Sequence, residues 1–343
     1  MSKKQAYILV SLGEPRDEGE ISSYIRSCFH EEEFSKQKKN WLFRLLRLGK
    51  IRKEIARYKR ECEAIISFSP TYAQIMQWKD AWAQYLSAPI FCFFLHLPST
   101  HRSFFEELKA CQADEYYLFP TFPQFSYGLT GQITRCFAQH VKKELLFRFR
   151  WIKSYAGHPA FVFFYQKIIQ EHMQKRSIRE EELILLFSCA GVDKSLLEEG
   201  DLYESECEIS YKEILKAFPY ALGRLSFQNY YEIRSSPMQP STLECCQTIA
   251  HWCEKRKKVL LVPLSFVVDG MSTLYEMDQI YLPLLKKQDF EAERASTPIL
   301  CSEWPKSCLE IFKEKNFVSN QMLVLAKDKE RNTEPNYEKA SFL

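Results

Sequence analysis

The sequence predicts an α/β protein built of two lobes, each a four-stranded parallel sheet flanked by helices, with a cleft between the lobes. Short apolar runs rich in aromatic and β-branched residues alternate with longer segments of helical period, which is typical of parallel sheets covered on both faces. Eight such runs fall into two groups of four. With 343 residues and 46% hydrophobic side chains, the chain can fill about two cores. Both lobes are therefore expected to be Rossmann-like.

The strands expected in the first lobe are 7–11, 89–95, 116–120 and 146–152, and those of the second are 182–189, 222–228, 258–267 and a weaker run near 295–300. Segments of helical period lie between them at 71–86, 102–111, 131–143, 159–175, 206–217, 241–256, 272–287 and 305–314. These elements place the first lobe at 1–152 and the second at 153–326. Residues 327–343 are polar and are predicted to form a disordered tail.

Residues 36–60 are strongly basic and depart from this pattern. In a helix, one broad face would carry Trp41, Leu45, Leu48, Ile51, Ile55 and Tyr58, and the opposite face Lys50, Lys53, Arg57 and Arg60. Two interpretations stay open. The helix could bind an anionic membrane surface as a peripheral contact, or it could pack on the domain with a solvated basic face.

Composition excludes several classes of protein. A net charge of +3 argues against a nucleic-acid-binding protein. The twelve cysteines form no C-x-x-C pair, so zinc-finger and redox motifs are missing, and the ten glycines form no Walker A or G-x-G-x-x-G loop. No apolar run is long enough for a spanning helix and no signal peptide is evident, so a cytoplasmic location is expected.

Ligands of open α/β sheets bind beyond the carboxyl ends of the strands. Here those ends are aromatic and apolar with few titratable groups, as in 119–127 and 266–270. A large, flat, apolar ligand would suit such a cleft better than a phosphate or a sugar.

Four blocks at these strand ends resemble the ferrochelatases, the family that inserts ferrous iron into a porphyrin. They are ILVSLGEP at 8–15, LFPTFPQFS at 118–126 with LTG following at 129–131, LLFSCAG at 185–191 with the trailing Gly-Asp-x-Tyr, and the stretch 262–278. Their order and spacing hold over residues 6–315. The resemblance implies a porphyrin cleft between the lobes and a hydrophobic lip near 36–60, often apposed to a membrane.

The resemblance also implies ligands and site residues. Porphyrin or haem would be the partner, with Fe²⁺ and porphyrin as substrates or ligands and no covalently bound cofactor. The cysteine-liganded iron–sulfur cluster of some members should be absent, because no cysteine follows residue 308. The candidate porphyrin-binding residues are Leu12, Phe122, Phe125, Ser126, Tyr127, Ser188, Gln228 and Asp269. Phe122, Phe125 and Tyr127 could equally pack the contact between the lobes.

The chain departs from the family at the residues that perform the chemistry. Iron insertion removes two pyrrole protons, which needs a base near neutral pKa such as histidine. Ala190 stands at the position of that histidine and Ser272 at that of the facing glutamate, while Gly270 replaces the histidine that follows Asp269. Neither alanine nor serine is a useful base at neutral pH.

Some acids of the last block remain, and the sequence leaves two functions open. Glu276 and Asp278 are the remaining catalytic candidates, and His96 and Cys189 are weak candidates for metal ligands; no other metal ligand is expected. The first function is a chelatase of haem biosynthesis whose activity is weak or lost. The second is a non-catalytic protein that binds porphyrin or haem, or a regulatory partner.

Overall fold

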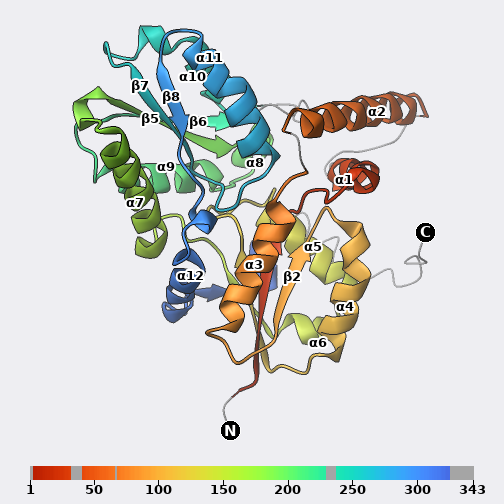
Figure 1. The fold of residues 1–343 in the computed structure, drawn as a ribbon. Coiled ribbons are helices and arrows are strands. Elements are labelled where there is room, and N and C mark those ends of the chain that lie inside the picture. Colours follow the sequence, from red (N-terminus) through yellow and green to blue (C-terminus); the bar gives the residue numbers. More distant parts are fainter. Residues whose placement is uncertain (1–2, 32–40, 66–67, 229–236, 325–343) are drawn as a thin grey trace.

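The computed structural model describes residues 3–31, 41–65, 68–228 and 237–324 (Figure 1). The predicted tail at 327–343 and the start of the basic segment, 36–40, lie outside the described residues. Side chains are described from residue 48 onward in that segment, so those of Trp41 and Leu45 are also outside.

Two sheets organise the two lobes, as the sequence predicts. The first has the order β2-β1-β3-β4-β9, where β1 (Gln5–Ser11), β2 (Ile90–Phe94), β3 (Glu115–Pro120) and β4 (Phe149–Ile152) are parallel. The second has the order β6-β5-β7-β8, all parallel, from β5 (Leu183–Ala190), β6 (Leu222–Gln228), β7 (Lys258–Pro263) and β8 (Glu291–Arg294). Continuous apolar runs such as that of β5 are buried on both faces, as parallel strands between helical layers require.

Two strands differ from the prediction. The weak run near 295–300 is not a strand: β8 lies just before it, and residues 298–300 form a 3-10 turn. The charged letters EAER of β8 give no apolar signal because this strand is at the edge of its sheet. The first sheet also gains a fifth strand, β9 (Phe317–Val318), which pairs antiparallel with β4. The lobe boundary after residue 152 stays a prediction.

Helices cover both sheets (Figure 1). In chain order they are α1 (Glu18–Glu31), α2 (Trp41–Ala64), α3 (Thr71–Ala83), α4 (His101–Ala110), α5 (Thr130–His140), α6 (Lys143–Leu146), α7 (Pro159–Arg176), α8 (Lys194–Glu198), α9 (Tyr203–Leu215), α10 (Thr242–Gln247), α11 (Leu282–Lys286) and α12 (Trp304–Lys313). The sequence alone did not predict α1, α6 or α8. Residues Ser272–Tyr281 form a π-helix that runs directly into α11.

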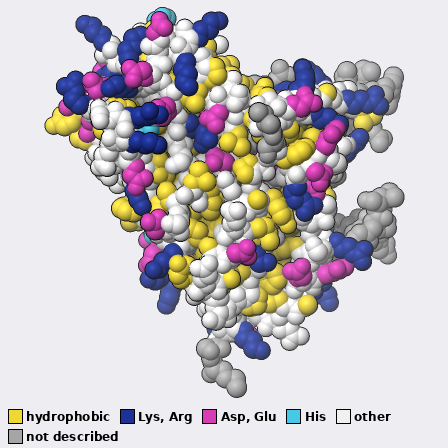
Figure 2. Space-filling model, viewed as in Figure 1, with side chains coloured by type: hydrophobic (Ala, Val, Ile, Leu, Met, Phe, Trp, Pro, Cys, Tyr) yellow, Lys and Arg dark blue, Asp and Glu magenta, His cyan; other side chains and the backbone are white. Residues whose placement is uncertain are grey.

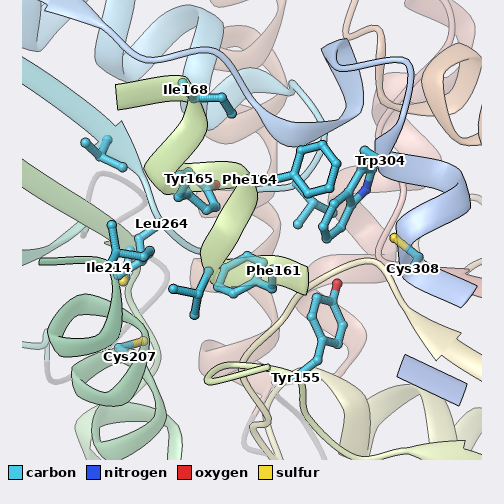
Figure 3. Close-up of a cluster of buried hydrophobic side chains, with 14 of the residues drawn as sticks. Tyr155, Phe161, Phe164, Tyr165, Ile168, Cys207, Ile214, Leu264, Trp304 and Cys308 are labelled. Atoms are coloured by element: carbon cyan, nitrogen blue, oxygen red, sulfur yellow. The ribbon is translucent and has the colours of Figure 1, made fainter. Parts of the chain in front are cut away.

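One apolar cluster joins the lobes (Figure 3). Trp304 of α12 is fully buried and packs edge-on against Phe164 of α7, with ring centroids 5.3 Å apart. The same indole lies near Trp78 of α3, which belongs to the first lobe. Helix α12 therefore packs between the first and second lobes, on the side away from α1 and α2.

The helix α2 of the basic segment extends beyond the sheets and packs on α1 (Figure 1). Ile51 and Tyr58 are buried in a cluster with Ile21 and Ile25 of α1 and Met271 of the second lobe. The face is less regular than the wheel predicts, because Leu48 is 44% exposed.

The basic side of α2 also differs from the wheel at one position. Lys50, Lys53 and Arg60 are exposed, whereas Arg57 lies between Glu54 and Glu61, with nitrogen–oxygen distances of 2.6 and 3.2 Å. In the part of the chain that is described, no helix has the length and apolar character needed to cross a membrane. On the viewed face, Lys and Arg side chains are interspersed with Asp and Glu (Figure 2).

Candidate functional site

At the carboxyl edge of the second sheet, Gln228 connects Ala190 with Ser272, two of the candidate catalytic positions. Ala190 ends β5 and is paired with Gln228, which ends the neighbouring strand β6. The Gln228 side-chain amide donates a hydrogen bond of 3.3 Å to the carbonyl oxygen of Ser272, the first residue of the π-helix. π-Helical turns are rare and occur frequently at functional sites. The edge is thus assembled around an alanine and a serine.

Both backbone polar groups of Ala190 are hydrogen-bonded, although its methyl side chain can neither accept a proton nor bind a metal ion. Its amide donates to Ser265 Oγ at 2.7 Å, and the Tyr203 hydroxyl donates to its carbonyl oxygen at 2.7 Å. Cys189 faces the opposite side of the strand, fully buried, as strand alternation predicts. There it contacts Cys207, whose thiol pKa is raised well above its usual value, chiefly by burial.

The two weak metal candidates lie in different lobes. His96 follows β2 in the first lobe, where its Nδ1 lies 3.1 Å from Ser27 Oγ. Burial lowers the pKa of His96 to about 4, with a smaller contribution from His101, so its ring is neutral at pH 7. Within the described residues, no three His, Cys, Asp or Glu side chains gather where they could hold a metal ion.

The two remaining acids of the π-helix lie in different surroundings. Glu276 is 1% exposed and accepts a hydrogen bond of 3.1 Å from the Tyr281 hydroxyl. Asp278 instead binds Arg294 in a bidentate pair at 2.8 and 3.0 Å, and the same guanidinium bonds Asp269 at 3.0 Å. A single arginine therefore pairs with both Asp269 and Asp278.

The candidate porphyrin-binding residues divide by exposure. Leu12, Phe122 and Tyr127 are partly exposed and pack on the core of the first lobe. The others are buried, namely Phe125, Ser126, Ser188, Gln228 and Asp269. Ser188 is enclosed in the second lobe, where its Oγ lies 2.8 Å from Thr242 Oγ1. Whether any of these residues contacts a porphyrin stays a prediction.

The block at 125–127 joins the lobes through carboxylates of the second lobe. The Ser126 hydroxyl and the Tyr127 amide both donate to Asp201 Oδ2 at 2.8 Å, and the Phe125 amide donates to Glu206. Burial raises the pKa of both carboxyls, although these bonds oppose the shift. We call these five residues the Asp201 junction; Phe125 and Tyr127 take part in it through their backbone amides, and both interpretations of their side chains stay predictions.

The sequence analysis did not predict a second junction between the two lobes. Glu14, in the turn after β1, accepts hydrogen bonds from the Met271 amide at 3.1 and 3.2 Å, and Thr71 of α3 bonds the Asp269 carbonyl oxygen at 2.8 Å. We call Glu14, Thr71, Asp269, Gly270 and Met271 the Glu14 junction. Its one signal in the sequence is an acid at the variable position of the L-G-x-P turn.

Comparison with known proteins agrees with this architecture. The family model described as Ferrochelatase matches residues 4–315. Proteins named ferrochelatase from Chlamydia felis and Chlamydia pneumoniae are 28% and 27% identical, each over 93% of this chain and over 98% and 96% of the relative. A solved structure of SirB from Bacillus subtilis with Fe³⁺ superposes with a TM-score of 0.53 at 12% identity, covering 96% of this chain and 98% of that one.

The SirB likeness supports the fold alone. The family match is independent of it and spans both lobes, including both junctions and the edge that carries Ala190 and Ser272. The chain belongs to the ferrochelatase family.

Proposed function

We propose that this protein binds a porphyrin at the facing carboxyl edges of its sheets and inserts ferrous iron into it only weakly. The observation that carries the proposal is the hydrogen bond from Gln228, paired with Ala190, to Ser272. In this proposal Gln228 connects the two candidate positions, and neither of them offers a base. Loss of one general base costs roughly 10²- to 10⁴-fold in rate.

The surroundings of this edge favour a flat apolar ligand. Leu12, Phe122 and Tyr127 offer partly exposed apolar surface at the ends of the first-lobe strands. The acids of the π-helix offer little free charge, because Glu276 is buried and Asp278 is bound to Arg294. Ferrous iron is a substrate in this proposal, and a place in haem biosynthesis follows from it.

The test compares the wild-type protein with an Ala190→His/Ser272→Glu double variant. Each is mixed anaerobically with ferrous iron and a porphyrin, and the metalloporphyrin spectrum is followed against a protein-free control. We expect weak insertion by the wild-type protein and at least a tenfold gain in the variant. Equal rates for the two proteins would mean that these positions no longer limit the reaction.

A second function, non-catalytic binding of porphyrin or haem, is favoured by the same pair of replacements. It predicts saturable binding in an absorbance titration without any insertion above the control. Absence of saturable binding to porphyrin and to haem would reject both functions.

A peripheral membrane contact through α2 is also proposed, supported by exposed Leu48, Lys50 and Lys53 on this helix, which extends from the sheets. Sedimentation with anionic vesicles should weaken in a Lys50→Gln/Lys53→Gln variant, by about 1 kcal/mol per lysine. Binding of the variant at wild-type strength would remove the electrostatic argument.

A further inference from the structure

We propose that Glu14 acts as the proton acceptor in the cleft, in place of the base and acid that Ala190 and Ser272 cannot supply. This inference rests on the proposed function. It assigns to the first lobe a role that the sequence pattern places only in the second.

The turn after β1 directs Glu14 toward the π-helix of the other lobe. Gly13 has a φ of +78°, and a Cβ there would lie 2.9 Å from the Phe94 side chain, so glycine is required at this turn. The next residue is Glu14, and its carboxylate reaches the amide of Met271, directly before Ser272. Two residues upstream, Leu12 is one of the candidate porphyrin contacts.

The space that holds the Glu14 carboxylate exists because residue 270 is glycine. A Cβ on Gly270 would lie 2.8 and 2.9 Å from the two Glu14 oxygens and 3.0 Å from Thr71 Oγ1. Where the family pattern has histidine, this chain therefore has a gap that a carboxyl from the opposite lobe fills. Glycine at position 270 and glutamate at position 14 therefore depend on each other, because the carboxylate occupies the space that a side chain at 270 would fill.

The Thr71 hydroxyl has two acceptors for one proton. Thr71 Oγ1 donates to the Asp269 carbonyl oxygen at 2.8 Å and to Glu14 Oε2 at 3.0 Å, and it lies 2.8 Å from Ser69 Oγ. A hydroxyl has one proton, so these two bonds share it. The Thr71 hydroxyl therefore stabilises the Glu14 carboxylate less than an undivided hydrogen bond would.

The electrostatics of the site agree with this geometry. Burial raises the pKa of Glu14 and the charge of Asp269 adds to the rise, while bonds from Ser69, Met271 and Thr71 oppose it. Cys62 of α2 also faces the carboxylate, and the only cation bonded to Asp269 among the described residues is Arg294, which Asp278 shares. A carboxyl whose pKa moves toward neutrality is a better proton acceptor at physiological pH.

The proposed step balances without a redox partner. Each pyrrole N–H bond breaks heterolytically, the nitrogen electron pair binds Fe²⁺, and the proton passes to the Glu14 carboxylate, giving the carboxylic acid. Glu14 then returns this proton to water before it accepts the second. Two protons leave, and iron remains in the ferrous state.

Glu14→Gln tests the role, because it keeps the size and one acceptor oxygen but cannot take up a proton. We expect porphyrin affinity within about threefold of the wild type and iron insertion reduced at least tenfold. If Glu14 is the proton acceptor, the insertion rate of the wild type rises with pH as Glu14 loses its proton. This rise should disappear in Glu14→Gln. In Glu14→Asp it should persist but occur at a different pH. Glu206→Gln is the matched control, since it alters a buried carboxyl of the other junction and should leave that pH dependence in place.

Each result bears on a different claim. Glu14→Gln that inserts iron at the wild-type rate with an unchanged pH profile would overturn the role of Glu14, as would a wild-type protein that binds porphyrin but inserts no iron at any pH. A wild-type protein that binds no porphyrin would instead overturn the proposed function. Melting curves of each variant separate a loss of folding from a loss of chemistry.

Discussion

The Asp201 junction and the Glu14 junction connect the same two lobes by the same device, a carboxylate that accepts backbone amides across the interface. They differ in what surrounds the carboxylate. Asp201 accepts hydrogen bonds from the Ser126 hydroxyl and from the Tyr127 and Tyr203 amides. Glu14 accepts from the Met271 amide and shares the Thr71 hydroxyl with the Asp269 carbonyl oxygen. The comparison teaches that one carboxylate is committed to joining the lobes, whereas the other also lies beside Ser272 in the candidate site.

The largest expected effect is at the Asp201 junction. Asp201→Ala removes the acceptor of the Ser126 hydroxyl and of the Tyr127 and Tyr203 amides, leaving three buried donors without it. We expect about 3 kcal/mol lower stability in urea unfolding. Asp193→Ala, which removes the N-cap of α8, should cost about 1 kcal/mol. Equal losses would mean that the junction does not fix the lobes.

A smaller effect is expected from Gly270→Ala, which tests whether the Glu14 junction is one unit. The added methyl meets both Glu14 oxygens, so the variant should lose about 2 kcal/mol of unfolding free energy. In a Glu14→Ala background the same change should cost much less, because the space is then free. Additive losses in the double variant would contradict the coupling of these residues.

The smallest effect concerns pH. The pKa of Glu14 is raised by burial, so its contribution to stability is present below an ordinary glutamate value of about 4.3 and is lost as pH rises through the folded value. Glu20, within the first lobe, is the opposite case, because hydrogen bonds from Arg16 lower its pKa to about 2. Its contribution is present above about 4.3 and is lost as pH falls toward 2.

Unfolding of two variants between pH 4 and pH 7 measures this contrast. Relative to the wild type, Glu14→Gln should gain stability as pH rises. Glu20→Gln should be about 1 kcal/mol less stable at pH 7, a modest value because solvent screens this pair, and the deficit should shrink as pH falls. Parallel pH curves for the two variants would remove the distinction between a buried and a paired carboxyl.

Sequence reasoning predicted the fold wherever burial leaves an apolar run. It located seven of the eight predicted strands and identified the strand ends at which Ala190, Gln228 and Ser272 meet. It misplaced β8, because an edge strand that reads EAER carries no apolar signal, and it overextended β7, because the turn after Pro263 is also apolar. Local pattern could not distinguish the π-helix from an α-helix of the same apolar period.

The Glu14 junction could not be predicted because its residues are far apart in the sequence and are brought together only by the fold. Glu14 and Met271 are 257 positions apart, and each looks ordinary in its own segment. Only the fold places the acid over the glycine. The hydrogen bonds of Phe125 and Ser126 in the Asp201 junction could not be predicted for the same reason, since Asp201 and Glu206 come from the other lobe.

Strand β9 has a consequence for the order in which the protein can be assembled during synthesis. It is made after the last strand of the second sheet, yet it covers the open edge of β4 in the first sheet. Asn320, just beyond it, accepts from the Trp151 indole at 3.1 Å and donates to the Thr134 carbonyl oxygen at 3.2 Å. While the ribosome is producing the second lobe, the first therefore has an unpaired strand edge and an unsatisfied buried indole. The nascent first lobe becomes complete only when the chain returns to it.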